Sequence, residues 1–228
     1  MEQKNGTDSQ RIKQILGILE KAYPKATTEL IFKTPFQLLI ATMLSAQTTD
    51  RQVNRVTPEL FGRYPDAGTL ANAPLEEIEE IIRSCGFYKT KAANIKEASR
   101  IIEEKYGGQV PRTVEELTSL PGVGRKTANV VVSNAFGVDA IAVDTHVFRV
   151  SNRIGLADSK DVEETERQLM ERIPQSKWSR AHHWLIHHGR KICSARKPKC
   201  SQCPIVHLCS YYHNYDLCSY YHNYGESE

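Results

Sequence analysis

The segment Leu120-Pro121-Gly122-Val123-Gly124-Arg125-Lys126-Thr127-Ala128 lies between two stretches with helical periodicity and is the most informative part of the chain. Gly122 and Gly124 allow a positive φ and a close approach of the backbone to another molecule. A tight turn that opens a helix presents bare N–H groups, which suit an anion such as one DNA phosphate. The segment predicts two helices joined by an anion-binding hairpin, although a plain connection has the same Gly-x-Gly pattern.

Two residues near this hairpin and after it carry possible chemistry. Lys126 lies in the first turn of the second helix, where the helix dipole disfavours a cation and, with Arg125 beside it, favours a nucleophilic amine. An exposed lysine that binds phosphate is the alternative. Asp144 precedes a later helix and predicts an N-cap. A capping carboxylate can also activate an attacking group and stabilise positive charge that develops on a sugar.

The rest of the chain is helical in pattern, and no stretch alternates convincingly with period two, so we predict an all-α fold. Ile12, Ile15, Leu16 and Leu19 share one helical face. Thr34-Pro35 is a strong helix start, and Thr113 with Glu116 predicts a capping box. We expect further helices over residues 35–45, 49–61 (ended by Gly62), 74–85, 89–106, 125–136, 145–154, 162–173 and 177–188.

Four cysteines near the C-terminus have the spacing C-x6-C-x2-C-x5-C and can close on one metal centre, namely Cys193, Cys200, Cys203 and Cys209. The spacing alone leaves zinc and iron–sulfur open, because both accept four thiolates. Arg196, Lys197 and Lys199 interrupt this run, which predicts either phosphate contacts or a solvated charged loop.

The composition limits the class of protein without naming one. The 228 residues suit one large domain or two small ones, and the formal charge of +3 is only weak evidence for a nucleic-acid partner. No apolar run reaches the roughly 18 residues that a membrane span needs. The polar residues 1–11 lack the apolar core of a signal peptide. We therefore expect an intracellular, cytoplasmic protein, located at the nucleoid if bacterial, whose cysteines are ligands or free thiols.

Taken together, these motifs resemble the endonuclease III family of helix-hairpin-helix DNA glycosylases. The resemblance runs from about residue 23 to residue 209 and includes the hairpin, the segments 44–50, 141–146 and 188–190, and the cysteine run, whose spacing is the family's [4Fe–4S] signature. It implies a six-helix barrel domain over residues 28–138 that carries the hairpin. Residues 1–27 and 139–228 would form a helical iron–sulfur domain with a mobile tail over 210–228, and DNA would lie in the cleft between the domains.

The resemblance also implies roles for individual residues. Lys126 stands at the position of the family's Schiff-base lysine, and Asp144 at that of its catalytic aspartate. Gln47 and Phe87 stand where the family fills the gap left by an extruded base, although the family often has a smaller aliphatic residue in place of Phe87. The other implied DNA contacts are Gly122, Val123, Gly124, Arg125, Thr127, His146, Arg196, Lys197 and Lys199.

The C-terminal tail departs from the family pattern. Residues 208–216 are followed by 217–225, which repeat them except at the last position, and two copies are too few for a solenoid. We interpret the repeat as a local duplication without a structural purpose. Cys209 and Cys218 have the same local sequence, but the family spacing and the shorter loop favour Cys209 as the fourth iron ligand.

The implied activity is that of a monomeric bifunctional glycosylase and AP lyase acting on duplex DNA that contains oxidised pyrimidines or abasic sites. One alternative is a monofunctional glycosylase for adenine or mismatched thymine, but those relatives tend to lack a lysine at the position of Lys126. A second alternative is a non-catalytic iron–sulfur protein that senses DNA damage. The presence of both Lys126 and Asp144 argues against it.

Overall fold

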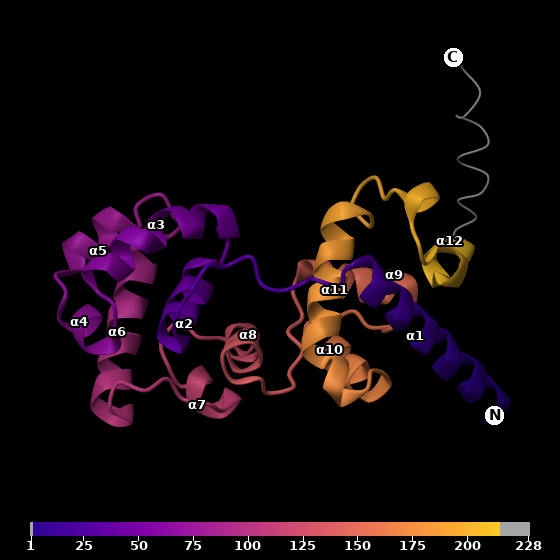
Figure 1. Cartoon of the computed structure of the whole chain (residues 1–228), viewed down its shortest axis with the longest axis horizontal. Helices are drawn as coiled ribbons and strands as arrows, with labels where there is room; N and C mark the ends of the chain where they lie inside the picture. Colours follow the sequence, from indigo (N-terminus) through magenta and orange to yellow (C-terminus); the bar gives the residue numbers. More distant parts are fainter. Residues whose placement is uncertain (1, 215–228) are drawn as a thin grey trace, which may run out of the picture. The chain divides into compact units, whose positions relative to one another are not determined.

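The computed structural model describes residues 2–214 of the chain, with side chains from residue 8 onward (Figure 1). Every regular element in this part of the chain is a helix, which confirms the predicted all-α fold. The chain divides into two compact units. Thr28–Ala140 forms one of them, called here the hairpin unit, and the segments before and after it form the other, called the cysteine unit.

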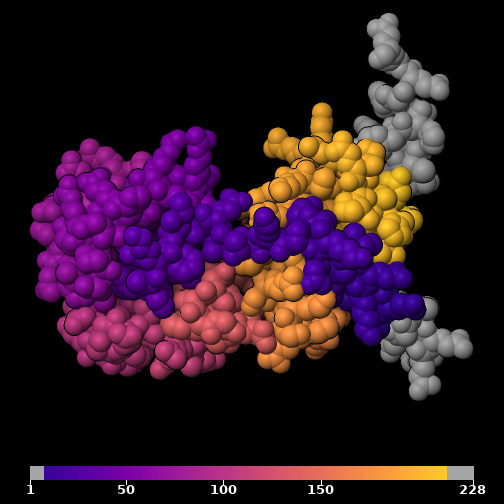
Figure 2. Space-filling view, in the orientation of Figure 1, coloured from indigo at the N-terminus to yellow at the C-terminus, as the bar shows by residue number. Residues whose placement is uncertain are grey.

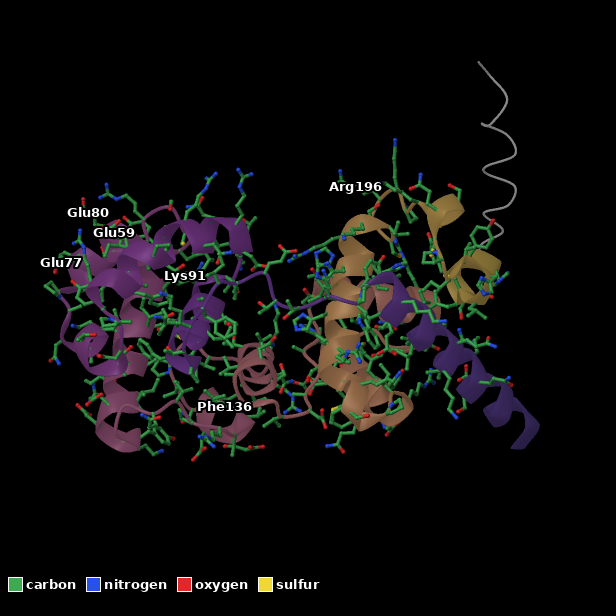
Figure 3. The ribbon with its side chains drawn as sticks, in the orientation of Figure 1. Glu59, Glu77, Glu80, Lys91, Phe136 and Arg196 are labelled. Carbon is green, nitrogen blue, oxygen red and sulfur yellow. The ribbon has the colours of Figure 1, made fainter. Side chains whose placement is uncertain are left out.

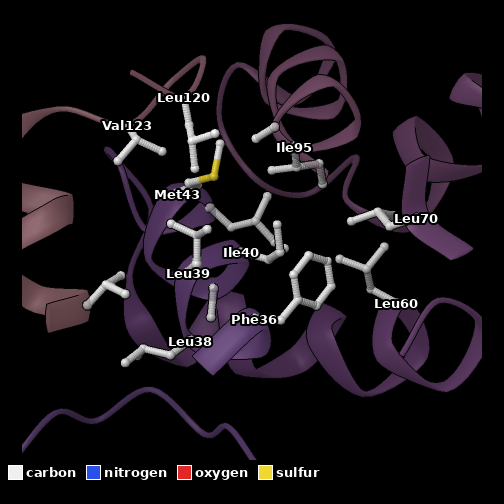
Figure 4. Packing of buried hydrophobic residues seen from close by; sticks show 14 of the residues in the cluster. Phe36, Leu38, Leu39, Ile40, Met43, Leu60, Leu70, Ile95, Leu120 and Val123 are labelled. Atoms are coloured by element: carbon white, nitrogen blue, oxygen red, sulfur yellow. The ribbon is translucent and has the colours of Figure 1, made fainter. Parts of the chain in front are cut away.

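The hairpin unit is built around one helix that is apolar on every side. Eight of the ten residues of α2 are buried, and Leu38, Leu39 and Ile40 are fully enclosed (Figure 4). A helix of this kind needs neighbours all round it, and α2 packs against α3, α6 and α8. The helices of the unit are α2 (Pro35–Leu44), α3 (Asp50–Arg63), α4 (Ala67–Asn72), α5 (Leu75–Ile81), α6 (Tyr88–Tyr106), α7 (Val114–Thr118) and α8 (Arg125–Phe136).

The helix starts follow the predicted caps, whereas two features of the unit differ from the prediction. Thr34, Thr49 and Thr113 each accept a hydrogen bond from the third helical N–H. Gly62 does not end α3, which continues to Arg63 and stops at Tyr64. The following Pro65 explains this end, because a residue before proline is disfavoured in helical conformation. Helix α4 is too short for its periodicity to be detected and depends on a capping box and on contacts with α6.

The cysteine unit has a core of its own. The predicted face of α1 (Ile12, Ile15, Leu16 and Leu19) is buried there with Trp184. Arg11 on α1 donates a hydrogen bond to the carbonyl of Leu208, and Figure 2 shows indigo α1 against the yellow C-terminal residues. The elements of the unit are α1 (Glu2–Ala22), α9 (Thr145–Ile154), α10 (Val162–Arg172), η1 (Gln175–Lys177), α11 (Trp178–Lys191), η2 (Cys200–Gln202), η3 (Val206–Leu208) and α12 (Ser210–Asn214).

The first residues of the tail, for which we expected mobility from residue 210 onward, form a helix in the structure. Ser210–Asn214 forms α12, and Tyr211 and Tyr212 pack against the core of the unit. Gly155 allows this docking, because a Cβ there would lie 2.2 Å from Oγ of Ser210. The second copy of the repeat and Cys218 lie outside the described residues. Among the helices of residues 2–214, none is both long and apolar enough to cross a membrane.

Candidate functional site

The hairpin between α7 and α8 needs glycine at one of its two glycine positions. Gly122 has a φ of 74°, and a Cβ there would lie 2.8 Å from Nδ2 of Asn94 on α6. Gly124 differs from the prediction, because its φ is −85° and the backbone is extended. It is the N-cap residue of α8, and a Cβ at this position would have no neighbour within 4 Å. The backbone at Gly124 is therefore exposed and uncovered by side chains.

The rest of the hairpin separates into an anchor and an exposed helix start. Val123 is buried in the core of the unit, and its N–H donates to the carbonyl of Leu120. Arg125 and Lys126 are exposed in the first turn of α8, and Thr127 is half-buried. Lys126 thus stands in the position that the sequence predicted, at the start of a helix with no side-chain cap.

Gln47 and Phe87 share an unusual backbone conformation. Among the described residues they are the only ones other than glycine with a positive φ, 53° and 56° respectively. This conformation is uncommon for a side chain with a Cβ and costs free energy, of order 1–3 kcal/mol per residue. Gln47 is exposed, and the side chain of Phe87 is 68% exposed, although Phe is a residue that folding normally buries.

These two residues lie on adjacent loops of the hairpin unit. Gln47 belongs to residues 45–49 between α2 and α3, called here the Gln47 loop, and Phe87 ends the connection between α5 and α6. A Cβ on Gly86 would lie 3.6 Å from the carbonyl oxygen of Gln47. The structure therefore brings together the two residues that the sequence predicted to fill a gap in DNA.

Asp144 lies in the cysteine unit, where it is the predicted N-cap residue of α9. Its Oδ1 accepts hydrogen bonds from the N–H groups of His146 (2.8 Å) and Val147 (2.7 Å). Its Oδ2 accepts no hydrogen bond from any residue that the structure describes. The half-buried carboxylate is thus fixed through one oxygen while the other remains available.

The four cysteines of residues 193–209, called here the cysteine loop, line a single pocket. In the described part of the chain, no three His, Cys, Asp or Glu side chains are placed to hold one metal ion. A single zinc ion would need sulfur atoms about 3.8 Å apart, from Zn–S bonds of about 2.3 Å in a tetrahedron. Four thiols around one pocket are also the ligand set of a polynuclear iron–sulfur cluster, with one ligand at each corner.

Burial of the pocket disfavours the charged thiolate form of its cysteines when no metal is bound. Burial raises the pKa of the Cys203 thiol to about 11, and the other three cysteines raise it further. Burial is also the main cause of the raised pKa values of Cys200 and Cys209. The pocket without metal therefore favours neutral thiols, and a bound metal must displace their protons.

Two arginines of α9 hold the cysteine loop, and no sequence motif pointed to either of them. Arg149 donates to the carbonyls of Gly189 and Cys193. Arg153 donates to the carbonyls of Ser194 (2.7 Å) and Ala195 (2.8 Å), and its guanidinium stacks on the Tyr211 ring. The loop is thus fixed to the helix that Asp144 opens.

A buried histidine also contacts the cysteine loop and was not predicted as a site residue. Nε2 of His188 lies 3.5 Å from Sγ of Cys203, and its Nδ1 lies 3.0 Å from the hydroxyl of Tyr23. Burial lowers the pKa of His188 to about 4 and raises that of Tyr23 to about 12. The ring of His188 is therefore neutral and the tyrosine hydroxyl keeps its proton.

The predicted DNA contacts of the cysteine unit differ in their exposure. Arg196, Lys197 and Lys199 are all exposed, and Arg196 projects from the ribbon in Figure 3. His146 is instead half-buried, and its Nδ1 lies 3.1 Å from a guanidinium nitrogen of Arg149. The basic residues are accessible to a charged partner, whereas His146 is partly taken up by a contact within α9.

Comparisons with known proteins agree with this description. Residues 40–175 match the family model of the HhH-GPD superfamily base excision DNA repair protein, and residues 193–209, from the first cysteine to the fourth, match the iron-sulfur binding domain of endonuclease III. Endonuclease III of Synechocystis sp. is 53% identical, covering 90% of this chain and 94% of the relative. Endonuclease III of Escherichia coli K12 is 47% identical, covering 89% of this chain and 96% of the relative.

Solved structures give the same result. The chain has a TM-score of 0.86 and 50% identity with a trapped endonuclease III–DNA covalent intermediate, covering 90% of this chain and 97% of that one. A thermostable thymine-DNA glycosylase has a TM-score of 0.81 at 28% identity, covering 90% of this chain and 98% of that one. The chain belongs to the endonuclease III family of base excision DNA repair proteins, within the HhH-GPD superfamily.

Proposed function

We propose that this chain is a bifunctional DNA glycosylase and AP lyase that removes oxidised pyrimidines, such as thymine glycol, and cleaves the strand at the resulting abasic site. The observation that carries the proposal is an exposed Lys126 in the first turn of a helix that a glycine hairpin opens. The trapped covalent intermediate of a 50% identical endonuclease III supports it.

The hairpin binds one phosphate of the duplex. Gly124 has no side chain to cover the start of α8, so the N–H groups there can approach a phosphate oxygen closely. Arg125 and Thr127 add contacts around the same phosphate. The exposed Arg196, Lys197 and Lys199 contribute further contacts that depend on charge and not on sequence.

The damaged nucleotide leaves the stack before the chemistry takes place. Extrusion costs a few kcal/mol for unstacking and unpairing. Gln47 and Phe87 enter the space that the nucleotide vacates, and the Phe87 ring stacks on the neighbouring bases. Their exposure and their adjacent loops support this role.

Lys126 and Asp144 then carry out base removal and strand cleavage. The amine of Lys126 forms a bond to C1′ of the sugar, the bond from C1′ to the base breaks, and the base departs with that electron pair. The bonded nitrogen loses one proton to water, and its lone pair then expels O4′ as the sugar ring opens. This leaves an iminium ion that keeps the second proton, and O4′ takes up a proton to become a hydroxyl. Asp144 stabilises the positive charge on the sugar through its available Oδ2, while its Oδ1 remains hydrogen-bonded to the start of α9.

The iminium ion makes strand cleavage possible. It acidifies the C2′ proton, and loss of that proton expels the 3′ phosphate by β-elimination. Water hydrolyses the remaining imine, which restores the amine of Lys126 and releases the cleaved strand. The reaction needs no oxidant, reductant or further cofactor.

The four cysteines of the cysteine loop hold a [4Fe–4S] cluster. The cluster, when bound, fixes the shape of the loop that presents the basic residues to DNA. Arg149 and Arg153 attach the same loop to α9. A DNA repair protein acts where the chromosome lies, which for a bacterial chain is the nucleoid.

Borohydride trapping on a duplex with one abasic site tests the proposal. Borohydride reduces an imine and thereby links enzyme and DNA covalently, so the wild type should be trapped. Lys126→Gln should lose both trapping and strand cleavage while it still binds the duplex, because Gln keeps most of the side-chain length without a nucleophilic amine. A monofunctional glycosylase would remove bases without being trapped, and trapping of the Lys126→Gln variant would disprove the role of Lys126.

A further inference from the structure

Lys91 on α6 is a buried lysine for which the proposed mechanism has no use. It is 7% exposed, and Nζ donates to the carbonyl of Leu44 (2.8 Å) and to Oγ1 of Thr48 (2.9 Å). No described carboxylate forms an ion pair with it. Burial lowers the pKa of this amine, because the charged form loses hydration. An aliphatic side chain would fill the same space without that cost.

The two acceptors of Lys91 belong to the ends of the Gln47 loop. Leu44 is the last residue of α2, and Thr48 directly follows Gln47 and precedes the N-cap of α3. The Lys91 side chain is therefore hydrogen-bonded on both sides of Gln47, which has an unfavourable positive φ. Without these hydrogen bonds the loop would lose a main constraint on that conformation.

The backbone of Lys91 is hydrogen-bonded to Phe87, the other residue that we propose enters the duplex. Its N–H donates to the carbonyl of Phe87 (3.0 Å), which closes the first turn of α6. Phe87 has a left-handed backbone and no side-chain cap. A further hydrogen bond near these segments, from Nε2 of Gln52 on α3 to Oγ of Ser84, is exposed. Lys91 is thus the buried connection between the segments that display Gln47 and Phe87.

We propose that Lys91 is a positioning residue for base extrusion, which holds Gln47 and Phe87 at the spacing at which both enter the duplex. This inference rests on the proposed function. It gives a role to a lysine in a buried position. Its ammonium holds the two sides of Gln47, and its backbone lies in the helical turn that Phe87 begins.

The role predicts a difference between two steps of the same reaction. Removal of a base from a duplex requires that a paired and stacked nucleotide leaves the helix. A preformed abasic site has no base to unstack, so its cleavage depends less on the entry of Gln47 and Phe87 into the duplex. A defect in Lys91 should therefore slow base removal far more than strand cleavage at an abasic site.

Lys91→Met tests the inference, since Met keeps the length and loses the donor. Lys96→Met is the matched control, because Lys96 lies on the same helix and its ammonium likewise donates to two acceptors, the backbone carbonyls of Ala71 and Ala73. Both variants should be assayed on one duplex sequence, containing either thymine glycol or an abasic site, together with thermal unfolding.

We expect Lys91→Met to lower kcat for thymine glycol removal by about tenfold, a loss of about 1.4 kcal/mol of transition-state stabilisation, with cleavage of the abasic duplex changed by less than about twofold. The control should leave the ratio of the two rates at the wild-type value. Equal loss of both activities in Lys91→Met, or no loss of either, would overturn the proposal.

A milder variant keeps the test valid if Lys91→Met does not fold. Thr48→Val removes one acceptor of the ammonium at a half-exposed position and should shift the ratio of the two rates in the same direction, by a smaller factor. An unchanged ratio in this variant would also count against Lys91. If the wild type itself is not trapped by borohydride on the abasic duplex, the proposed function fails, and not the role of Lys91.

Discussion

His188 lies between Cys203 and Tyr23: its Nε2 is 3.5 Å from the sulfur of Cys203, and its Nδ1 is 3.0 Å from the hydroxyl of Tyr23. When Cys203 binds the cluster as a thiolate, it can only accept a hydrogen bond, so the imidazole proton then lies on Nε2. The ring is neutral, so Nδ1 is unprotonated and accepts the hydroxyl proton of Tyr23 across 3.0 Å. All three side chains are buried or nearly so, and the ring of His188 is fully enclosed.

The first prediction concerns the reduction potential of the cluster. His188→Leu should make the potential more negative, because a hydrogen bond to a ligand sulfur stabilises the more negatively charged, reduced cluster. His188→Gln should retain most of the wild-type potential if its amide donates from a place near that of Nε2. Voltammetry of both variants, at equal iron content, checks the expectation. Equal potentials in wild type and His188→Leu would show that the bond does not act on the cluster.

The second prediction separates the structural role of Asp144 from its chemical role. Asp144→Asn should unfold at nearly the wild-type temperature, because the amide oxygen can still accept the N–H groups of His146 and Val147. Its turnover should fall by about a hundredfold or more, the usual contribution of a positioned acid–base group. Asp144→Ala should lose the same activity and about 1 kcal/mol of stability as well. Normal turnover in Asp144→Asn would show that Asp144 acts only as the N-cap of α9 and takes no part in the chemistry.

The third prediction compares the two glycines of the hairpin. Gly122→Ala should lower the free energy of unfolding by about 1–3 kcal/mol, because the new Cβ meets both a positive φ and the side chain of Asn94. Gly124→Ala should leave that free energy nearly unchanged, since its backbone is extended and the surrounding space is open. It should still weaken binding to duplex DNA, because the methyl group would lie between α8 and a phosphate. Unimpaired DNA binding by Gly124→Ala would show that the phosphate does not bind beside Gly124 at the start of α8.

The sequence was sufficient for features that depend on local chemistry. Thr34 and Thr49 are caps because their hydroxyl groups reach nearby N–H groups, and the periodic face of α1 is buried because the spacing of its apolar residues matches one side of a helix. The resemblance selected Gln47 and Phe87, but only the structure shows that both have a positive φ and lie on adjacent loops.

Long-range partners could not be inferred from the sequence in the same way. The sequence pattern predicts that Lys91 is an ordinary surface lysine on an amphipathic helix. Its burial follows only from the packing of α6 against α2. His188 is separated from Tyr23 by 165 positions, so no local pattern links them. Gly124 appeared equivalent to Gly122, and the structure distinguishes the two by the positive φ of Gly122 and by the approach of Asn94 to it.

The last prediction concerns the choice between Cys209 and Cys218 as the fourth iron ligand. Cys209 is buried in the same pocket as Cys193, Cys200 and Cys203, and the iron–sulfur family model ends at this residue. Its thiol lies 3.6 Å from the carbonyl of Arg153, on the helix that holds the cysteine loop. Cys218 has the same neighbours in sequence but lies outside the described residues. We therefore expect Cys218→Ser to keep the visible charge-transfer absorbance of the cluster and its iron content.

Cys209→Ser should reduce that absorbance. A double variant, Cys209→Ser with Cys218→Ser, shows whether Cys218 in the second copy of the repeat replaces the lost ligand. Cys218 would have to close a loop of fourteen intervening residues in place of five, an entropic cost of roughly 0.9 kcal/mol from the ratio of loop lengths. So small a cost permits partial replacement, in which case Cys209→Ser retains some iron and the additional Cys218→Ser change removes it. If the second copy has no such role, Cys209→Ser and the double variant will contain equally little iron. Retention of the cluster in Cys209→Ser together with its loss in Cys218→Ser would reverse the assignment.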